Sequence, residues 1–533
     1  RILLLTFTRR AAQEMLRRAG AIIEQSEGKG AGKVWGGTFH ATANRLLRVY
    51  AHAAGISPDF TVMDQADGED MMDVVRRELK LGRQKKRFPR KQTCMNIYSR
   101  CVDADEDLNV VLNKHFRHCK EWTDQLKELF REYVEAKQEH EVLDYSDLLL
   151  YWKYLLEDDA IAGRLSNRFE YILVDEYQDT NPIQAAIVRG MRKTNSNVTV
   201  VGDDAQSIYR FRAATVRNML DFPKQFPGTS IVKLEQNYRS VISILETTNA
   251  VIAQAREVYE KKLWSTRGEG RKPQLVTCFD ENEQNDYVVR SALERYEQGV
   301  QLREQADLFR ASHLSDTLEI QLTQHRIPYR KYGGLRFLEA AHVKDMISFL
   351  KIAENPRDTI AWLRILQLFD GIGAVRARGI VEHIAANNYD PLSVATCGPP
   401  APAAKGVEQL RELLGYMLQC GRRDPASQVA KVRMFYKPYL KRFYTNHSTR
   451  AQDLEHLEQI ATGYRSRRQF ITQLVLDPPS GTSELADRNT QEEDWLVLST
   501  IHSAKGCEWD AVTVIHAADG WLPSDLAAGD AEA

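Results

Sequence analysis

The chain has 533 residues and a formal net charge of −1, with 72 Lys and Arg against 73 Asp and Glu. This length exceeds the size at which one hydrophobic core stops growing, so several domains are expected. A composition of 43% hydrophobic and 27% charged residues is that of ordinary globular proteins, and overall basicity gives no sign of nucleic-acid binding. The sequence contains no apolar run of membrane-spanning length and no signal-peptide pattern.

The seven cysteines are spread along the chain without a CxxC pair or a Cys/His cluster. This spacing argues against a structural zinc or iron–sulfur site. It favours a reduced compartment, and we expect a cytoplasmic protein.

The first half of the chain predicts an α/β domain that is interrupted by helices. From 51 to 140 the pattern is helical and charge-rich, and 143–150 then re-enters the first domain. We therefore predict a first parallel-sheet domain at 1–50 and 141–236, with a helical insertion at 51–140. Short apolar runs predict its strands, at 2–5, 171–175 and 198–202.

The second half predicts the same organisation. A second parallel-sheet domain is expected at 237–350 and 487–533, interrupted by a helical insertion at 351–486. The Pro-rich stretch at 397–403 predicts an extended loop, and 477–481 marks the return to the sheet domain. Strands are predicted at 274–278, 306–310, 495–500 and 511–515.

The strand that begins at Tyr171 ends in two carboxylates, Asp175 and Glu176. Four consecutive apolar residues predict burial on both faces, as in a parallel sheet, and such sheets bind ligands beyond the carboxyl ends of their strands. An Asp there can hold Mg²⁺ on a nucleotide phosphate, and a neighbouring Glu can polarise the attacking water. The alternative is a solvated acidic turn that caps the strand.

Six strings of residues decide between these alternatives. They are Thr6–Met15, Gly37–His40, Tyr171–Asn181, Gly202–Arg212, Leu234–Ser240 and Ser499–Trp509. In this order they resemble the UvrD/Rep/PcrA family of superfamily 1 DNA helicases, over essentially the whole chain. The resemblance implies two RecA-like domains, each with a helical insertion, and an ATP-dependent DNA helicase that moves 3′ to 5′ on single strands.

The same resemblance assigns the nucleotide site, with ATP and Mg²⁺ as the expected cofactors. Asp175 is assigned to Mg²⁺ and Glu176 to water activation. Gln206 would contact the γ-phosphate or its attacking water, and Arg239 would reach the γ-phosphate from the second domain. As isolated residues, Gln206 and Arg239 would be read as ordinary surface side chains. Further nucleotide contacts are expected from Tyr238, Gly506 and Glu508.

Aromatic residues that follow the predicted strands are candidates for base stacking, which contributes roughly 1–3 kcal/mol per base. The alternative for each ring is ordinary core packing. Threonine hydroxyls in the same strings suit phosphate oxygens and would fix register without reading sequence. The candidates for DNA contact are Thr6, Phe7, Thr8, Thr38, Phe39, His40, Tyr209, Phe211, Thr500 and His502.

Two segments in the helical insertions are candidates for contact with duplex DNA. Gly371-Ile372-Gly373, followed by Val375, is similar to a helix–hairpin–helix, whose glycines free backbone N–H groups for a phosphate. The alternative is a plain Gly-rich connector. The basic run Arg83–Lys91 suits duplex phosphates, although a solvated loop explains it equally well.

The phosphate-binding loop of the family, GxxxxGK[ST], has no match in this sequence. The stretch Gly28–Val34 has the wrong spacing, Val34 cannot supply the Mg²⁺-binding hydroxyl, and a helical pattern precedes it. We therefore expect an internal portion of a longer protein, with this loop before Arg1 and the final arginine motif after Ala533. Residues 1–533 alone should be deficient in ATP hydrolysis.

Two other functions stay open at this stage. A helicase–nuclease subunit would require a nuclease domain outside this sequence, and a non-catalytic DNA-binding module would have lost the phosphate-binding loop. For the helicase, we expect single-stranded and duplex DNA as partners, no membrane association, a monomer or weak dimer, and a role in DNA repair, replication or recombination.

Overall fold

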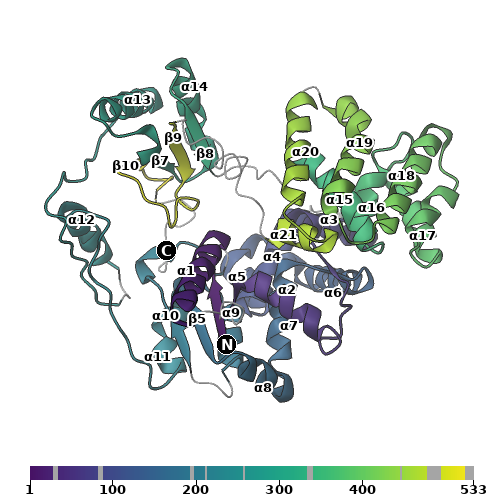
Figure 1. The fold of residues 1–533 in the computed structure, drawn as a ribbon, viewed down its shortest axis with the longest axis horizontal. Coiled ribbons are helices and arrows are strands. Elements are labelled where there is room, and N and C mark those ends of the chain that lie inside the picture. The colour runs from purple at the N-terminus through teal and green to yellow at the C-terminus, as the bar shows by residue number, and fades with distance from the viewer. Residues whose placement is uncertain are drawn as a thin grey trace. The chain divides into compact units, whose positions relative to one another are not determined.

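The computed structural model divides into two compact units (Figure 1). Unit 1 contains residues 1–240, 248–267 and 341–477, and unit 2 contains 241–247, 268–340 and 478–533. In the described part of the chain, no helix is long and apolar enough to cross a membrane. The residues that the structure describes are 1–27, 34–81, 88–192, 197–210, 213–255, 259–332, 340–444, 447–476 and 494–522.

The sheet of unit 1 has four parallel strands in the order β2-β1-β5-β6. They are β1 (Ile2–Thr6), β2 (Val34–Thr38), β5 (Tyr171–Val174) and β6 (Val198–Val200). The three predicted strands are confirmed. Strand β2 was not predicted because two glycines interrupt its apolar pattern. A Cβ on Gly36 would lie 2.6 Å from Leu16 Cδ2, so this glycine allows the preceding helix to pack closely.

Helices cover this sheet and bury its apolar side chains. Helix α1 packs against β1 and β2, α2 packs against α7, and α7 packs against α9. The core contains Leu3, Phe39, Trp152 and Ile172. The longer helices are α1 (Arg9–Glu27), α2 (Phe39–Tyr50), α7 (Tyr145–Leu155), α8 (Asp159–Arg168) and α9 (Pro182–Gly190). The short helices α10 (Arg217–Leu220) and α11 (Phe222–Gln225) follow β6.

The first insertion is helical, as predicted, with one addition. Strand β3 (Thr61–Val62) pairs in parallel with β4 (Val142–Leu143), so a short two-stranded sheet joins the insertion to the domain. Next to it, the buried Lys137 ammonium lies 2.7 Å from a carboxylate oxygen of both Asp144 and Asp147. The helices of the insertion are α3 (Gln65–Glu78), α4 (Lys91–Ala104), α5 (Leu108–His115) and α6 (Thr123–Glu139).

The second insertion is also helical and belongs to unit 1. The predicted loop at 397–403 is wrong beyond Pro400, because a helix begins at Ala401. Pro402 lies in the first turn of that helix, where the missing N–H needs no partner. The predicted return at 477–481 lies outside the described residues. The helices are α15 (Ala341–Glu354), α16 (Thr359–Leu366), α17 (Ala374–Ala386), α18 (Ala401–Gln419), α19 (Pro425–Phe443), α20 (His447–Ala461) and α21 (Arg467–Leu476).

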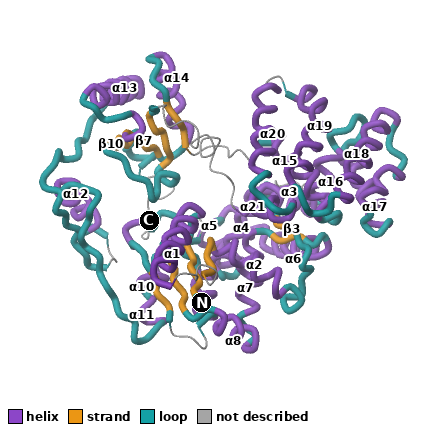
Figure 2. The backbone as a smooth tube through the Cα atoms, in the orientation of Figure 1, coloured by secondary structure: helices purple, strands orange, loops and turns teal. Residues whose placement is uncertain are grey.

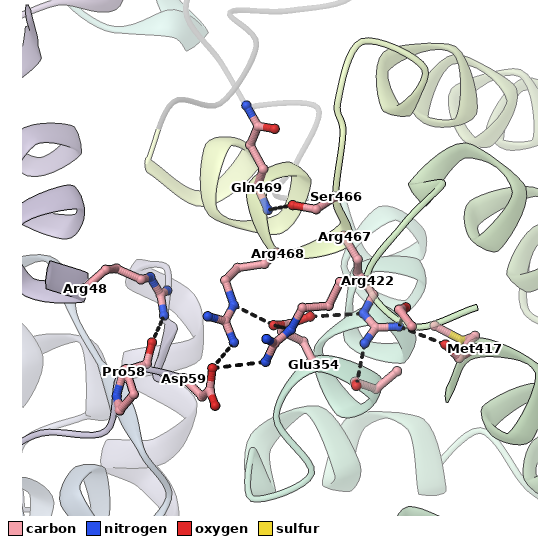
Figure 3. A network of polar contacts seen from close by, with 12 residues as sticks. Arg48, Pro58, Asp59, Glu354, Met417, Arg422, Ser466, Arg467, Arg468 and Gln469 are labelled. Carbon is pink, nitrogen blue, oxygen red and sulfur yellow. Dashed lines mark hydrogen bonds and ion pairs between the residues drawn. The ribbon is translucent and has the colours of Figure 1, made fainter. Parts of the chain in front are cut away.

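A buried carboxylate, Glu354, lies in the second insertion beside a junction where Arg422 and Arg468 reach Asp59 in the rest of unit 1 (Figure 3). It accepts hydrogen bonds from Arg467 at 3.2 Å and Arg468 at 2.6 Å, and it pairs with Arg422 at 2.7 Å. Arg422 and Arg468 also pair with Asp59, which precedes β3. Three guanidinium groups therefore share one buried carboxylate at this junction.

Unit 2 contains a second parallel sheet, in the order β10-β7-β9-β8, with helices packed beside it (Figure 2). The strands predicted at 306–310, 495–500 and 511–515 are confirmed. The strand predicted at 274–278 is wrong, because those residues are largely exposed and pair with no other strand that the structure describes. The elements are β7 (Gln305–Phe309), β8 (Tyr329–Tyr332), β9 (Leu496–Thr500), β10 (Ala511–Val514), α12 (Ile242–Ile252), α13 (Glu281–Glu297) and α14 (Asp316–Gln324). Helix α12 straddles the boundary between the units.

Candidate functional site

The carboxyl ends of the four parallel strands of unit 1 lie at one edge of the sheet, and most predicted site residues follow them. Phe7 comes after β1, His40 after β2, Glu176 after β5, and Gln206 and Tyr209 after β6. This edge is the place where parallel sheets bind ligands. The topology therefore brings residues that are distant in sequence to one face of the domain.

The backbone at Glu176 is in the left-handed region, with φ at +54°. Residues other than glycine rarely adopt this conformation, which costs roughly 1–3 kcal/mol and is often found at functional sites. The preceding Asp175 N–H donates to the Leu5 carbonyl at 2.8 Å, which holds the turn against the central strand. The surrounding structure therefore maintains a strained turn directly at the two carboxylates.

Gln178 connects this turn to the next one. Its side-chain Nε2 donates to Glu176 Oε2 at 2.5 Å. Its side-chain oxygen, Oε1, accepts the backbone N–H of Asp203 at 3.0 Å. The residue is fully buried. A Cβ on Gly202 would lie 2.5 Å from the side-chain Oε1 of Gln178, so the glycine leaves space for the Gln178 side chain between the two turns. One buried amide therefore fixes the Glu176 carboxylate relative to the turn after β6.

Gln206 ends a short 3₁₀ turn, Asp204–Gln206, and its side chain is exposed. Its amide donates to Asp203 Oδ2 at 2.9 Å. Asp203 Oδ1 accepts the Ala205 N–H at 3.1 Å, so the same carboxylate also caps the turn. Asp203 thus orients the Gln206 amide and is itself anchored by Gln178.

Arg239 and Tyr238 lie in a loop that the structure assigns to unit 1. Asn237 Oδ1 accepts the backbone N–H groups of Arg239 at 2.9 Å and Ser240 at 2.7 Å. The Tyr238 ring is 73% exposed, and its hydroxyl donates to Gln236 at 2.8 Å. An exposed ring and a guanidinium on a side-chain-stabilised loop are suited to contact a nucleotide.

The ring of Phe7 packs on that of Tyr209, with centroids 4.8 Å apart and ring planes inclined by 30°. Both rings are partly buried. His40 makes an edge-to-face contact with Tyr145 at 5.7 Å between centroids. The predicted stacking residues Phe7 and Tyr209 thus form one aromatic pair at the edge of the sheet.

The structure corrects the prediction for Phe39. It is the first residue of α2, it is 2% exposed, and it packs on Trp152 in the core. A buried ring has no face free for a base, so Phe39 is a packing residue. Thr6 is similarly buried, at 1% exposure, which removes its hydroxyl from contact with a phosphate in this structure.

Thr8 and Thr38 cap the helices that follow them. Their hydroxyl groups accept the N–H groups of Ala11 and Ala41, each at 3.3 Å. In the capping bond the hydroxyl oxygen is the acceptor, through one of its lone pairs. The hydroxyl hydrogen can therefore still donate to another acceptor. Thr8 is exposed, so this arrangement is compatible with a phosphate contact at the start of α1, whereas Thr38 is only 9% exposed.

In unit 2, the predicted residues cluster after β9. Thr500 ends the strand, and its hydroxyl donates to Ser503 Oγ at 3.0 Å. Gly506 ends the following turn with φ at +82°, a conformation that favours glycine. His502 is partly buried and Glu508 is exposed. These four residues therefore lie on one loop at the carboxyl edge of the second sheet.

Comparison with known proteins gives the family. Residues 1–227 match the model of the UvrD/REP helicase N-terminal domain, and residues 232–390 match that of the UvrD-like helicase C-terminal domain. The chain is 32% identical to DNA helicase II of Escherichia coli, over 98% of this chain and 73% of that protein. It is 28% identical to the ATP-dependent DNA helicase PcrA of Bacillus subtilis, over 98% of this chain and 72% of that protein. The chain belongs to the UvrD-like DNA helicases.

This UvrD-like protein is an ATP-dependent DNA helicase with two RecA-like domains. Sequence reasoning assigned no role to Gln178, although it lies two residues after Glu176 in the string Tyr171–Asn181. Its role depends on a partner in the turn after β6, which no local pattern reveals. It also missed Lys261, which pairs with Asp203 and Asp204.

Several predictions for this helicase concern residues outside the described part of the chain. They are the stretch Gly28–Lys33, most of the basic run at 83–91, and Phe211. From the basic run, Lys91 is described, and it pairs with Asp70 at 2.5 Å.

Proposed function

We propose that this UvrD-like helicase is a 3′–5′ translocase that hydrolyses ATP at the carboxyl edge of its first sheet. The observation that carries the proposal is the bridge through Gln178, which ties the Glu176 carboxylate to the turn that orients Gln206. Hydrolysis of a γ-phosphate requires groups that are oriented before the reaction begins. A buried amide between two such groups supplies that orientation.

Each residue predicted for the nucleotide site has a role in this proposal. Glu176 orients and polarises the attacking water, Gln206 contacts the γ-phosphate, and Arg239 stabilises the charge that develops on it. We propose that Tyr238 stacks on the adenine ring and that Gly506 and Glu508 contact the sugar or phosphates. Asp175 supplies the carboxylate oxygen that Mg²⁺ prefers, at the end of β5. When bound there, Mg²⁺ would neutralise phosphate charge.

We assign single-stranded DNA to the edge of the first sheet and to the loop after β9. The partly exposed Phe7–Tyr209 pair supports stacking of bases, and the capping hydroxyls of Thr8 and Thr38 support contact with phosphates. His40, Thr500 and His502 complete the proposed strand contacts.

Duplex DNA is assigned to the hairpin between α16 and α17. Gly371 has φ at +77°, and Gly373 is the N-cap residue of α17 without a capping side chain. Ile372 is buried, whereas Val375 in the first turn of α17 is 86% exposed. A helix start whose N-cap residue supplies no capping side chain supports contact between its first N–H groups and a backbone phosphate.

We further propose a cytoplasmic protein that acts in DNA repair, replication or recombination as a monomer or weak dimer. Its two RecA-like domains would comprise 1–50 with 141–236, and 237–350 with 487–533. A polypeptide restricted to residues 1–533 should hydrolyse ATP poorly, because its sequence contains no GxxxxGK[ST] loop to cradle the phosphates.

Directional unwinding tests the proposal. The full-length protein is incubated with ATP and duplexes that carry either a 3′ or a 5′ single-stranded tail. Unwinding of the 3′-tailed duplex alone is expected. Preferential unwinding of the 5′-tailed duplex would contradict the proposed 3′–5′ polarity. Unwinding that requires neither ATP nor a single-stranded tail would contradict the proposal of a translocase.

A further inference from the structure

Lys261 is anchored on the turn that carries Gln206. Its ammonium group donates to one oxygen each of Asp203 and Asp204. The Lys261 side chain is 17% exposed and that of Asp204 is 1% exposed, so water screens this pair only weakly, whereas the Asp203 side chain is 33% exposed. Burial favours the neutral form of Asp203, but hydrogen bonds from Lys261 and Gln206 outweigh it and lower the pKa of Asp203. Burial also favours neutral Lys261, but its hydrogen bonds to Asp203 and Asp204 outweigh this and raise the pKa of Lys261.

A second residue docks the same segment. The Tyr259 N–H donates to Asp204 Oδ2 at 3.0 Å, and its hydroxyl donates to the Met219 carbonyl at 3.1 Å. With Lys261, three donors of this segment therefore contact the structure that follows β6. These polar contacts hold residues 259–261 against the structure that follows β6 within unit 1.

The residues that follow Lys261 hold the loop with Arg239. The Trp264 carbonyl accepts the Asn237 N–H at 2.7 Å, and the Trp264 N–H donates to the Glu235 carbonyl at 3.1 Å. The Arg267 guanidinium donates to the Arg239 carbonyl. Lys261 thus lies at the point where the segment that supports Arg239 meets the turn that orients Gln206.

We propose that Lys261 is a positioning residue for ATP hydrolysis, which holds both Gln206 and the Arg239 loop in place within unit 1. The inference rests on the proposed roles of Gln206 and Arg239. Neither role requires Lys261 to contact the nucleotide. Loss of its ammonium should therefore slow the chemical step, kcat, more than it weakens ATP binding.

The test uses the full-length protein and compares Lys261→Met with Lys261→Arg and with Lys262→Met, which removes the exposed neighbouring charge. Rates of ATP hydrolysis stimulated by single-stranded DNA are measured with the unfolding temperature and the affinity for that DNA. We expect Lys261→Met to lower kcat by about tenfold and to change KM by less than about threefold, since a displaced catalytic group acts mainly on the transition state. Lys261→Arg should restore much of the rate, and Lys262→Met should match the wild type.

A double variant separates positioning from general stability. If Lys261 acts through Gln206, Lys261→Met should lower kcat by a much smaller factor in the Gln206→Ala background than in the wild type. The reason is that the effects of residues that act as a unit are not additive. Undiminished turnover in Lys261→Met would overturn the inference. So would loss of DNA binding with a lowered unfolding temperature in both Lys261 variants, or a fully additive double variant. A wild-type protein without DNA-stimulated hydrolysis would instead refute the proposed function itself.

Discussion

The rings of Phe7 and Tyr209 lie 4.8 Å apart between centroids, although they follow different strands of the first sheet. The two ring planes are tilted by 30°. Both rings are partly exposed, and stacking of a base on an aromatic ring does not depend on the identity of the base. This relationship leads to the first prediction.

Phe7→Ala and Tyr209→Ala should each weaken binding of single-stranded DNA. Base stacking contributes roughly 1–3 kcal/mol, which corresponds to an increase in Kd of about 5- to 150-fold. Unwinding should become uncoupled from hydrolysis, with little change in ATPase rate without DNA. Fluorescence anisotropy with labelled oligonucleotides measures the affinity, and Tyr154→Ala, at an exposed position on α7, is the control. Wild-type affinity in both variants would assign the two rings to packing alone.

The helix hairpin gives a second prediction. Val375→Glu places a negative charge next to the proposed phosphate contact, at a position that is 86% exposed. It should reduce affinity for a duplex with a single-stranded tail, while affinity for the single strand is retained. Met434→Glu, on α19 of the same insertion and 66% exposed, is the matched control. Equal effects of the two substitutions would remove the hairpin from the duplex site.

Glu354 gives a third prediction, about stability. Glu354→Gln removes the charge that three guanidinium groups share at a buried junction. Breaking a buried pair on one side typically lowers the free energy of unfolding by about 3–5 kcal/mol. Glu455→Gln removes a carboxylate that pairs with Arg433 at the surface, and should cost less than about 1 kcal/mol. Urea denaturation compares the two variants, and similar midpoints would show that the junction contributes little.

A fourth prediction concerns pH. Asp307 in β7 is buried, and Oδ2 has no hydrogen-bond partner among the described residues. Burial raises its pKa to about 7, against the opposing effects of Thr513 and Arg295. Between about pH 4 and 7 the folded protein binds a proton that the unfolded chain releases, so the free energy of unfolding falls as the pH rises.

Asp307→Asn should therefore stabilise the protein at pH 8 relative to the wild type, and the difference should shrink towards pH 5. Thermal unfolding at both values measures this, with Asp286→Asn, at an exposed position on α13, as the control. A constant difference across the pH range would exclude ionisation of Asp307 as its cause.

Sequence patterns located the sheet and its functional edge because both are local properties. An apolar run followed by Asp175 specifies a buried strand and its end, and β5 occurs there. The pattern could not show which way a ring points. Phe39 and Phe7 both follow a strand, but Phe39 begins a helix whose inner face packs on Trp152. Only tertiary packing distinguishes these two positions.

Contacts between distant segments were equally invisible. Gln178 and Lys261 both act on the turn at Asp203, and neither has a local pattern that identifies its partner. The strand predicted at 274–278 fails for a related reason, since an apolar run forms a strand only where a neighbour pairs with it.

The central claim is that Glu176 activates the water that attacks ATP. The most direct measurement is single-stranded DNA-stimulated ATPase of Glu176→Gln in the full-length protein, beside Glu157→Gln as a control at an exposed position. The substitution keeps the shape and removes the charge, so a fall in kcat of about 10²–10⁴-fold is expected, with ATP and DNA binding retained. Turnover at the wild-type rate would contradict the assignment of Glu176 and the account of the site built on it.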